Sequence, residues 1–285
     1  MSTATTPPED DTAADYTPVP DRVGALLNRR DAPNRPSALA ASLAFCWRAL
    51  LKIKHVPEQM IDVTVFPIII TLMFTFLFGG ALAGSTREYV QFLLPGIMVI
   101  SVLMITMYTG MGINTDVEKG IFDRFRTLPI WRPAALVGAL LGDVLRYVLA
   151  ATVIVLLGLV LGYRPSGGAT GMIAAMVLVI VFAFAFSWIW IMFGLLLRSE
   201  KSVMAVSMPV LFPLTFLSNV FVDPSTMPGW LQAFVKVNPI THLVTATRQL
   251  AAGTWDTGEL AWVLVSCAVL IVVFGTISIR LYNRK

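Results

Sequence analysis

Two ionisable residues, Asp143 and Arg146, lie inside a long apolar run. Ionisable side chains are costly in such runs, so they are candidates for proton relays, ion sites or buried ion pairs. A spacing of three residues places both on one face of a helix, where they can neutralise each other. Both lie where the run begins. We therefore predict an intramembrane ion pair with a structural role rather than a proton relay.

No motif for metal binding, disulfide chemistry or nucleotide hydrolysis is present in the sequence. Cys46 and Cys267 lie far apart without a CxxC neighbour, and His55 and His242 are isolated. A P-loop needs a lysine directly after a glycine, and no glycine here is followed by lysine. We predict no catalytic residue, cofactor site or metal site in this chain, so any ATP must be hydrolysed by another chain.

The densest charge between two apolar runs lies in NTDVEKGIFDRFRTLPIWRP, residues 114–133. Thr115 and Glu118 have the form of a capping box, which predicts a short helix starting near Asp116. Its apolar residues recur on one stripe, and charged residues cover the other faces. Two interpretations fit: a solvated connector on the membrane surface, or a helix that fills a partner's groove.

The composition is that of an integral membrane protein. The chain is 56% hydrophobic and 13% charged, with a mean hydropathy of +0.77, whereas soluble domains are about 25% charged. Six apolar runs approach the roughly 20 residues that cross a bilayer. They are residues 61–82, 92–113, 143–161, 171–197, 203–222 and 260–281. Their continuity indicates helices rather than barrel strands, so we predict an all-α polytopic protein with six spans.

Two segments precede the first span. Residues 1–36 lack apolar periodicity and are rich in Pro, Thr, Ala and Asp, which predicts a disordered cytoplasmic tail without a cleaved signal peptide. The remaining 37–285 form the membrane domain. It begins with residues 37–55, whose apolar stripe and Trp47 fit a helix in the interface plane. A soluble helix packed on a partner is the alternative.

The distribution of lysine and arginine predicts the orientation. With the amino terminus inside, sixteen lie on the cytoplasmic side and four, namely Arg87, Arg164, Lys236 and Arg248, on the outer side. This asymmetry favours both termini in the cytoplasm. The outer segment 223–259 is divided by prolines and contains apolar stretches. We expect two short helices there that dip into the outer leaflet.

Small and soft side chains suggest where helices approach each other. Gly138 with Gly142, and Gly158 with Gly162, have the small-xxx-small spacing that permits close helix contact. Met104, Met107 and Met111 share a face of the second span, near Tyr108. Such a face is an adaptable lining if it meets a cavity, and otherwise it is ordinary helix packing.

Four segments in one order resemble the type-2 ABC exporter permeases, and most closely the daunorubicin/doxorubicin-resistance permease subfamily. They are WRALLKIKHVPEQ (47–59), FGGALAGSTREYVQFLLPGIM (78–98), EKGIFDRFRTLPIWRP (118–133) and SNVFVDPSTMPGW (218–230). The resemblance covers nearly all of the chain after Ser37. It implies a six-helix permease of the plasma membrane with an amino-terminal elbow helix. That permease forms a homodimer and binds two copies of a separate ATPase, which holds ATP and Mg.

The resemblance also implies site residues. The polar helix becomes the coupling helix that docks on the ATPase. We expect Phe125 to be its hydrophobic anchor, because buried aromatic residues contribute most to such interfaces. Its residues are Val117, Glu118, Gly120, Ile121, Asp123, Arg124, Phe125, Arg126, Leu128 and Pro129. The second and fifth spans face the path of an amphipathic drug, antibiotic or lipid. The path residues are Ser101, Met104, Met107, Tyr108, Phe212, Leu214, Phe216 and Asn219.

Two other functions compete with export. An ion-coupled secondary transporter would carry midplane ionisable groups and inverted repeats; only Asp143 and Arg146 qualify, and the sequence has no such repeat. A membrane scaffold or immunity protein has the same composition. A neighbouring gene for a P-loop ATPase would distinguish these classes. Membrane lipids are expected partners, and nucleic acid is not.

Overall fold

A computed structural model describes residues 36–54, 57–83, 85–122, 131 and 133–284. Ser37–Lys285 forms one compact unit. In the described residues of that unit, helices are joined by turns and bends without any strand. The all-α prediction is therefore confirmed for this part of the chain, whereas the predicted tail lies almost wholly outside the described residues.

Each predicted apolar run corresponds to a helix. The helices are α2 (Ala38–Lys54), α3 (Pro57–Ala83), α4 (Thr86–Glu118), α6 (Ala134–Val160), α7 (Gly168–Leu196), α8 (Glu200–Phe216), η1 (Pro224–Thr226), α9 (Gly229–Val237), α10 (Pro239–Ala252), α11 (Thr257–Leu270), the π-helical η2 (Ile271–Gly275) and α12 (Thr276–Arg284). Among the described residues, four helices are long and apolar enough to cross a membrane, namely α4, α6, α7 and the continuous helix Thr257–Arg284. The apolar parts of α2 and α3 are shorter, and α8 has 17 residues.

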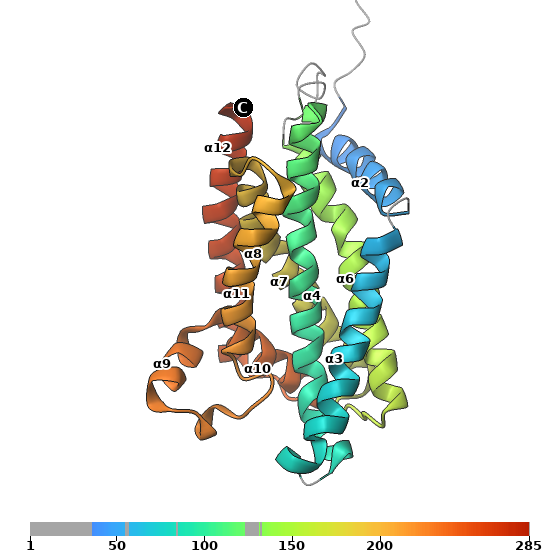
Figure 1. Ribbon diagram of the computed structural model, residues 1–285, viewed down its shortest axis with the longest axis vertical. Coiled ribbons are helices and arrows are strands. Elements are labelled where there is room, and N and C mark those ends of the chain that lie inside the picture. Colours follow the sequence, from blue (N-terminus) through green and yellow to red (C-terminus); the bar gives the residue numbers. More distant parts are fainter. Residues whose placement is uncertain (1–35, 55–56, 84, 123–130, 132, 285) are drawn as a thin grey trace, which may run out of the picture. The chain divides into compact units, whose positions relative to one another are not determined.

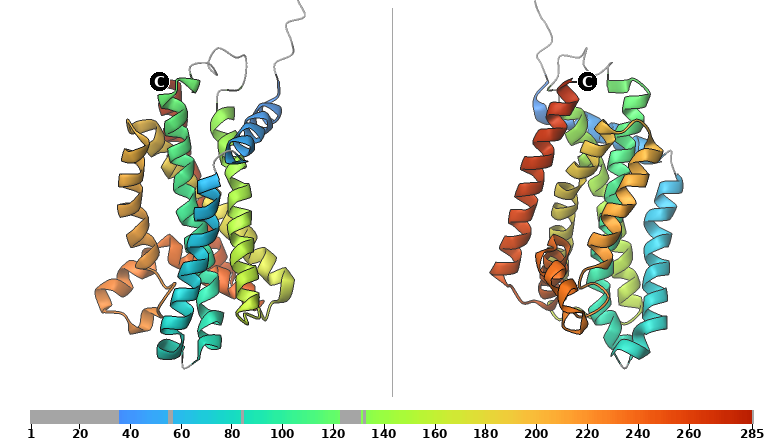
Figure 2. Two further views of the ribbon diagram at one scale, coloured as in Figure 1. Left: turned by 45° about the vertical axis from the view of Figure 1, so that its right-hand side comes forward. Right: turned by 60° about the vertical axis from the view of Figure 1, so that its left-hand side comes forward.

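The long helix α4 is the centre of the bundle. It contacts α3, α6, α7, α8 and α10 (Figures 1 and 2). Its sequence is apolar on all sides, and a helix of that kind must be buried on all sides. Leu93, Ile97 and Leu103 are accordingly inaccessible to solvent. Ser85 caps the start of the helix, because its hydroxyl accepts a hydrogen bond from the Glu88 amide at 3.2 Å.

Glycines permit two close helix contacts. A Cβ at Gly138 would collide with Phe45, and one at Gly142 would lie 2.5 Å from the Ala49 Cβ, so α2 packs directly on α6. The carbonyl of Gly110 on α4 would likewise obstruct a Cβ at Gly194 on α7. The predicted close approach is confirmed for the pair in α6 that faces α2.

The predicted start of a helix near Asp116 is wrong. α4 continues to Glu118, and the Thr115 hydroxyl donates to the Met111 carbonyl of the same helix at 2.9 Å. Nothing before Thr115 interrupts the helix, so its hydroxyl has no free helix start to cap. The actual break is at Gly120, which has a φ of 64°, a conformation that glycine adopts readily.

Two predicted span boundaries are also corrected. α6 begins at Ala134 rather than Asp143, so the ion-pair residues lie within the helix instead of at its start. α8 ends at Phe216 rather than Val222. The Leu214 and Leu217 carbonyls accept hydrogen bonds from Asn238 at 2.7 and 3.1 Å, which lets the chain leave the helix without buried unpaired carbonyls.

The two ends of the bundle differ. At one, called here the C-terminal end, α4 ends, α8 begins and α12 ends (Figure 1). At the other, called the α9–α10 end, lie η1, α9, α10 and the start of α4. Short helices are therefore present where the sequence predicted them between residues 223 and 259.

Candidate functional site

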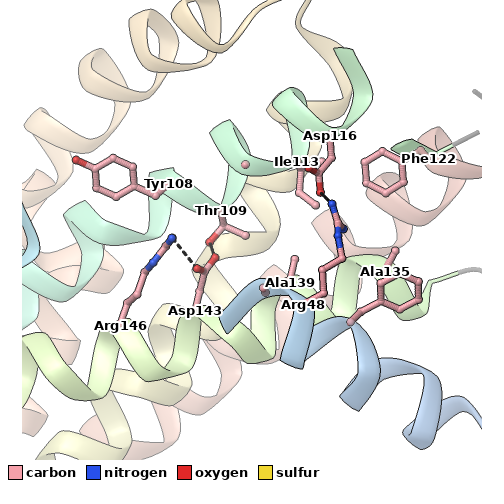
Figure 3. A pocket seen from close by; sticks show the side chains of 13 residues that line it. Arg48, Tyr108, Thr109, Ile113, Asp116, Phe122, Ala135, Ala139, Asp143 and Arg146 are labelled. Atoms are coloured by element: carbon pink, nitrogen blue, oxygen red, sulfur yellow. Dashed lines mark hydrogen bonds and ion pairs between the residues drawn. The ribbon is translucent and has the colours of Figure 1, made fainter. Parts of the chain in front are cut away.

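Charged side chains from three helices meet near the C-terminal end. Arg48 of α2 donates to Asp116 of α4 at 3.1 Å, and Arg146 of α6 donates to Asp143 at 2.8 Å. Together with Thr109 these four residues define the polar junction (Figure 3). They line a cavity of about 70 Å³. A cavity this small has room for a few water molecules rather than a drug.

The Asp143 carboxylate is fully engaged. One oxygen accepts from Arg146, and the other accepts from the Thr109 hydroxyl at 2.6 Å. Tyr147 extends the network, since its hydroxyl lies 3.3 Å from that of Thr109 and 2.7 Å from that of Ser187. This buried network joins α4, α6 and α7, and its charges are compensated, as buried charges must be.

The last turns of α4 are tied to neighbouring helices. The Asn114 side-chain amide donates to the carbonyls of Gly194 and Leu197, at 3.0 and 2.8 Å, at the end of α7. Thr115 also donates to the Glu200 carboxylate at 3.1 Å, at the start of α8. These hydrogen bonds fix the end of α4 to the end of α7 and the start of α8.

The predicted coupling helix is only partly described. Val117 and Glu118 belong to α4, Gly120 lies in the turn, and Ile121 begins the next helical residues. The rest of the set lies outside the described residues, namely Asp123, Arg124, Phe125, Arg126, Leu128 and Pro129.

Phe122 follows the turn and was not predicted as a site residue. It is 7% exposed, and its ring meets that of Tyr282 edge to face at 5.2 Å between centroids. Phe122 therefore anchors the start of this segment to α12. The two residues are far apart in the sequence, so no local pattern could have revealed the contact.

A second cavity, of about 210 Å³, lies between α3, α4 and α8. We call it the methionine cavity. Among the described residues it is lined by Phe66, Pro67, Ser101, Met104, Ile105, Met107, Tyr108, Met204 and Met208, none of which carries a charge. The four path residues predicted on α4 thus meet at one cavity. Met204 and Met208 were missed, although their four-residue spacing is the signal of a shared helix face.

The predicted path residues on α8 do not line this cavity. Phe212 and Phe216 stack on each other at 4.2 Å, and Phe216 stacks on Phe221 at 5.2 Å. This aromatic row points toward the α9–α10 end. Leu214 packs against the main core, and Asn219 is buried and donates to Thr245 at 2.9 Å.

Tyr108 connects the two sites, because it lines both the small cavity of the polar junction and the methionine cavity. Figure 3 shows Tyr108 one residue before Thr109 on α4, on the side of Arg146. One helix thus carries residues of both sites. Arg48, Thr109 and Asp116 were not predicted as site residues. Arg48 and Asp116 are 68 residues apart, and Thr109 is 34 residues from Asp143, so no local pattern signals either pairing.

Comparison with known proteins agrees with this architecture. The profile of the ABC-2 type transporter family matches residues 41–251. The chain is 50% identical to the daunorubicin resistance ABC transporter permease protein DrrB1 of Streptomyces coeruleorubidus, over 96% of this chain and 97% of that protein. It is 22% identical to the probable doxorubicin resistance ABC transporter permease protein DrrC of Mycobacterium tuberculosis, over 85% and 92%. It is 23% identical to the putative transport permease ycf38 of Cyanophora paradoxa, over 83% and 86%.

Proposed function

The chain belongs to the ABC-2 type transporter family, and on that premise we propose that it is the permease subunit of an ATP-driven exporter of amphipathic drugs, antibiotics or lipids. The daunorubicin and doxorubicin resistance named in its relatives supports a drug as substrate. A separate ATPase subunit would supply ATP hydrolysis. The chain would lie in the plasma membrane with six spans and both termini in the cytoplasm.

The observation that carries this proposal is the methionine cavity. Its thioethers, aromatic rings and the Ser101 and Tyr108 hydroxyls suit a ligand that is mostly apolar with a few polar groups. Methionine adapts to irregular shapes and makes favourable contacts with aromatic rings. The carboxylate of Asp143 has both oxygens engaged, so it lends no support to an ion-coupled mechanism.

A second copy would complete the path. Phe66, Met204 and Met208 line the cavity and are also 47%, 45% and 37% exposed. Exposed apolar side chains of a membrane helix face either lipid or a partner chain, and these three border the opening of the cavity. In the proposed homodimer these faces meet, and Phe212 and Phe216 continue the path toward the outer leaflet.

Two ATPase copies would act on the C-terminal end. In this proposal the residues after Gly120, with Phe125 as the anchor, dock on the ATPase, and the charges of Arg124 and Arg126 fix the register. The fixed contacts of Phe122, Asn114 and the polar junction would carry the displacement to α4 and α8, whose other residues line the cavity.

The test is export by the chain expressed with its ATPase. Cells with both subunits should accumulate less fluorescent anthracycline than cells with the ATPase alone. Met107→Ala should weaken export of some drugs and not others. Leu264→Ala is the control, because Leu264 is exposed on α11, a helix that contributes no residue to the cavity lining, and it should leave export of all drugs unchanged. If both variants changed drug export equally, the methionine cavity would not be the substrate path.

Docking has a separate test. Phe125→Ala should reduce copurification with the ATPase. Arg124→Glu should do the same, and the opposite charge reversal on the ATPase should restore copurification. Unchanged copurification and export in both variants would mean that this segment is a solvated connector.

A further inference from the structure

Arg248, near the end of α10, makes an unusual set of contacts at the α9–α10 end. Its guanidinium donates to the carbonyls of Phe92, Asn219 and Val220 at 3.0, 2.9 and 2.9 Å. The guanidinium also lies over the Phe92 ring, 3.7 Å from its centroid. No carboxylate among the described residues forms an ion pair with it, so its donors serve backbone carbonyls of two other segments.

These carbonyls need partners for a structural reason. α8 ends at Phe216, and the chain through Asn219 and Val220 is a bend without a helical hydrogen-bond ladder. Carbonyls buried there must find donors elsewhere. The planar guanidinium of arginine carries its donors on three separate nitrogens, and here each nitrogen donates to a different carbonyl. The three donors of lysine share one nitrogen and do not have this geometry.

The start of α10 repeats the arrangement. The Asn238 amide donates to the carbonyls of Leu214 and Leu217, while its oxygen accepts from the Ile240 amide at 3.0 Å and caps α10. Both ends of α10 thus hold the chain at the end of α8. Arg248 differs from Asn238, because it also holds Phe92 of α4.

The geometry points to Arg248 as a latch. It is the positioning residue that holds α4 and the α8 segment together, and it limits how readily the substrate path opens at the α9–α10 end. The two segments are already in contact, since a Cβ at Gly96 would lie 3.3 Å from the Val220 Cβ. α4 and α8 are also two walls of the methionine cavity. Release at this end requires the walls to separate and the Arg248 hydrogen bonds to break or rearrange.

This inference rests on the proposed function and its orientation, in which the α9–α10 end is outside. The test measures the latch without relying on transport. Ser101→Cys, a buried position of the cavity, is placed in a chain in which Cys46 and Cys267 are alanine, together with the ATPase. An impermeant thiol reagent is then added from outside to the nucleotide-free complex.

Arg248→Lys should raise the rate of labelling roughly two- to tenfold, the factor expected for loss of one net hydrogen bond. The matched control is Arg164→Lys. Arg164 also donates to carbonyls near this end, but those of Leu159 and Tyr163 in its own turn. If the two variants were labelled at the same rate, Arg248 would not act as a latch. This outcome is distinct from failure of the proposed function, which drug export by the unaltered complex tests separately.

A cysteine pair keeps the inference testable if Arg248→Lys does not accumulate. Cysteines at Gly96 and Val220 have nearly the Cβ separation of a disulfide, which is about 3.8 Å. Oxidation should block export by the complex, and reduction should restore it. Undiminished export by the cross-linked chain would show that these walls need not separate, and the latch would be wrong.

Discussion

The polar junction and the methionine cavity lie side by side on α4 but are built in opposite ways. The junction is a set of charges in fixed pairs, with Arg146 and Asp143 8% and 9% exposed. The described lining of the cavity contains four methionines, two of them substantially exposed, and no charged residue. Among the described residues, Tyr108 alone lines both the small cavity of the polar junction and the methionine cavity.

This contrast corresponds to two physical requirements. A buried charge network has few alternative arrangements, because each unpaired group costs free energy. It therefore suits a region that transmits displacement. Unbranched thioether side chains have many rotamers of similar energy, so they suit a surface that binds ligands of different shapes.

The largest effect is expected at Asp143. Asp143→Ala leaves Arg146 buried without its carboxylate, and breaking a buried pair in this way costs about 3–5 kcal/mol. The amount of correctly assembled protein after mild heating in detergent should fall sharply. Replacing both partners, as Asp143→Leu with Arg146→Met, should recover most of the loss. A single variant as stable as the unaltered chain would show that the pair is not structural.

A smaller loss is expected where α2 packs on α6. Gly138→Leu would drive a side chain into Phe45 and the Ser42 carbonyl, and overpacking of this kind costs about 1–3 kcal/mol. Gly80→Leu is the control, because nothing lies within 4 Å of a Cβ at that glycine. Heating in detergent should separate the two variants. Equal stability would argue against a direct contact between α2 and α6.

Arg48 should affect coupling more than stability. Its side chain is 39% exposed, and partly exposed ion pairs contribute about 1 kcal/mol or less. Arg48→Gln should therefore leave the yield of complex nearly unchanged while it lowers drug-stimulated ATP hydrolysis. Exchange of the pair, as Arg48→Asp with Asp116→Arg, should restore part of the stimulation. If the single variant is stimulated normally, the junction does not couple the two activities.

The smallest effect is expected at the rim of the methionine cavity. Met204→Leu conserves volume, and such exchanges cost less than about 1.5 kcal/mol. The ratio of the export rates of two drugs should change only a few-fold. Some change is expected because leucine has fewer rotamers than methionine and no sulfur. Competition between two fluorescent substrates would measure this change. A change as large as that of Met107→Ala would mean that the rim matters as much as the buried wall.

Much of the helical architecture was predictable, because a long apolar run must leave water. The hydropathy and length of the runs therefore indicated the helices, among them the buried α4 and α7. Local patterns were less reliable. The spacing of Thr115 and Glu118 fits a helix start, yet a sequence pattern cannot show whether a helix is already present before it. Contacts such as Arg48 with Asp116 and Phe122 with Tyr282 depend on how distant helices pack, which no local pattern contains.

Site residues that lie close together in the sequence were predicted better than those that come together from distant segments. Ser101, Met104, Met107 and Tyr108 share one helix, so their common lining followed from spacing together with the family resemblance. The residues of the fifth span were placed less well. α8 ends before Asn219, and Asn238 and Arg248 satisfy the carbonyls of Leu217 and Asn219 that have no helical partner.

In the proposed exporter the two regions do different work: the cavity binds the drug, and the junction couples drug binding to the ATPase. Drug-stimulated ATP hydrolysis, measured against drug concentration in the assembled complex, tests this most directly. Met107→Ala should change the half-saturating drug concentration and leave the maximal rate near that of the unaltered complex. Arg48→Gln should lower the maximal rate with half-saturation unchanged. Changes in the same parameter for both variants would contradict the division between the two regions.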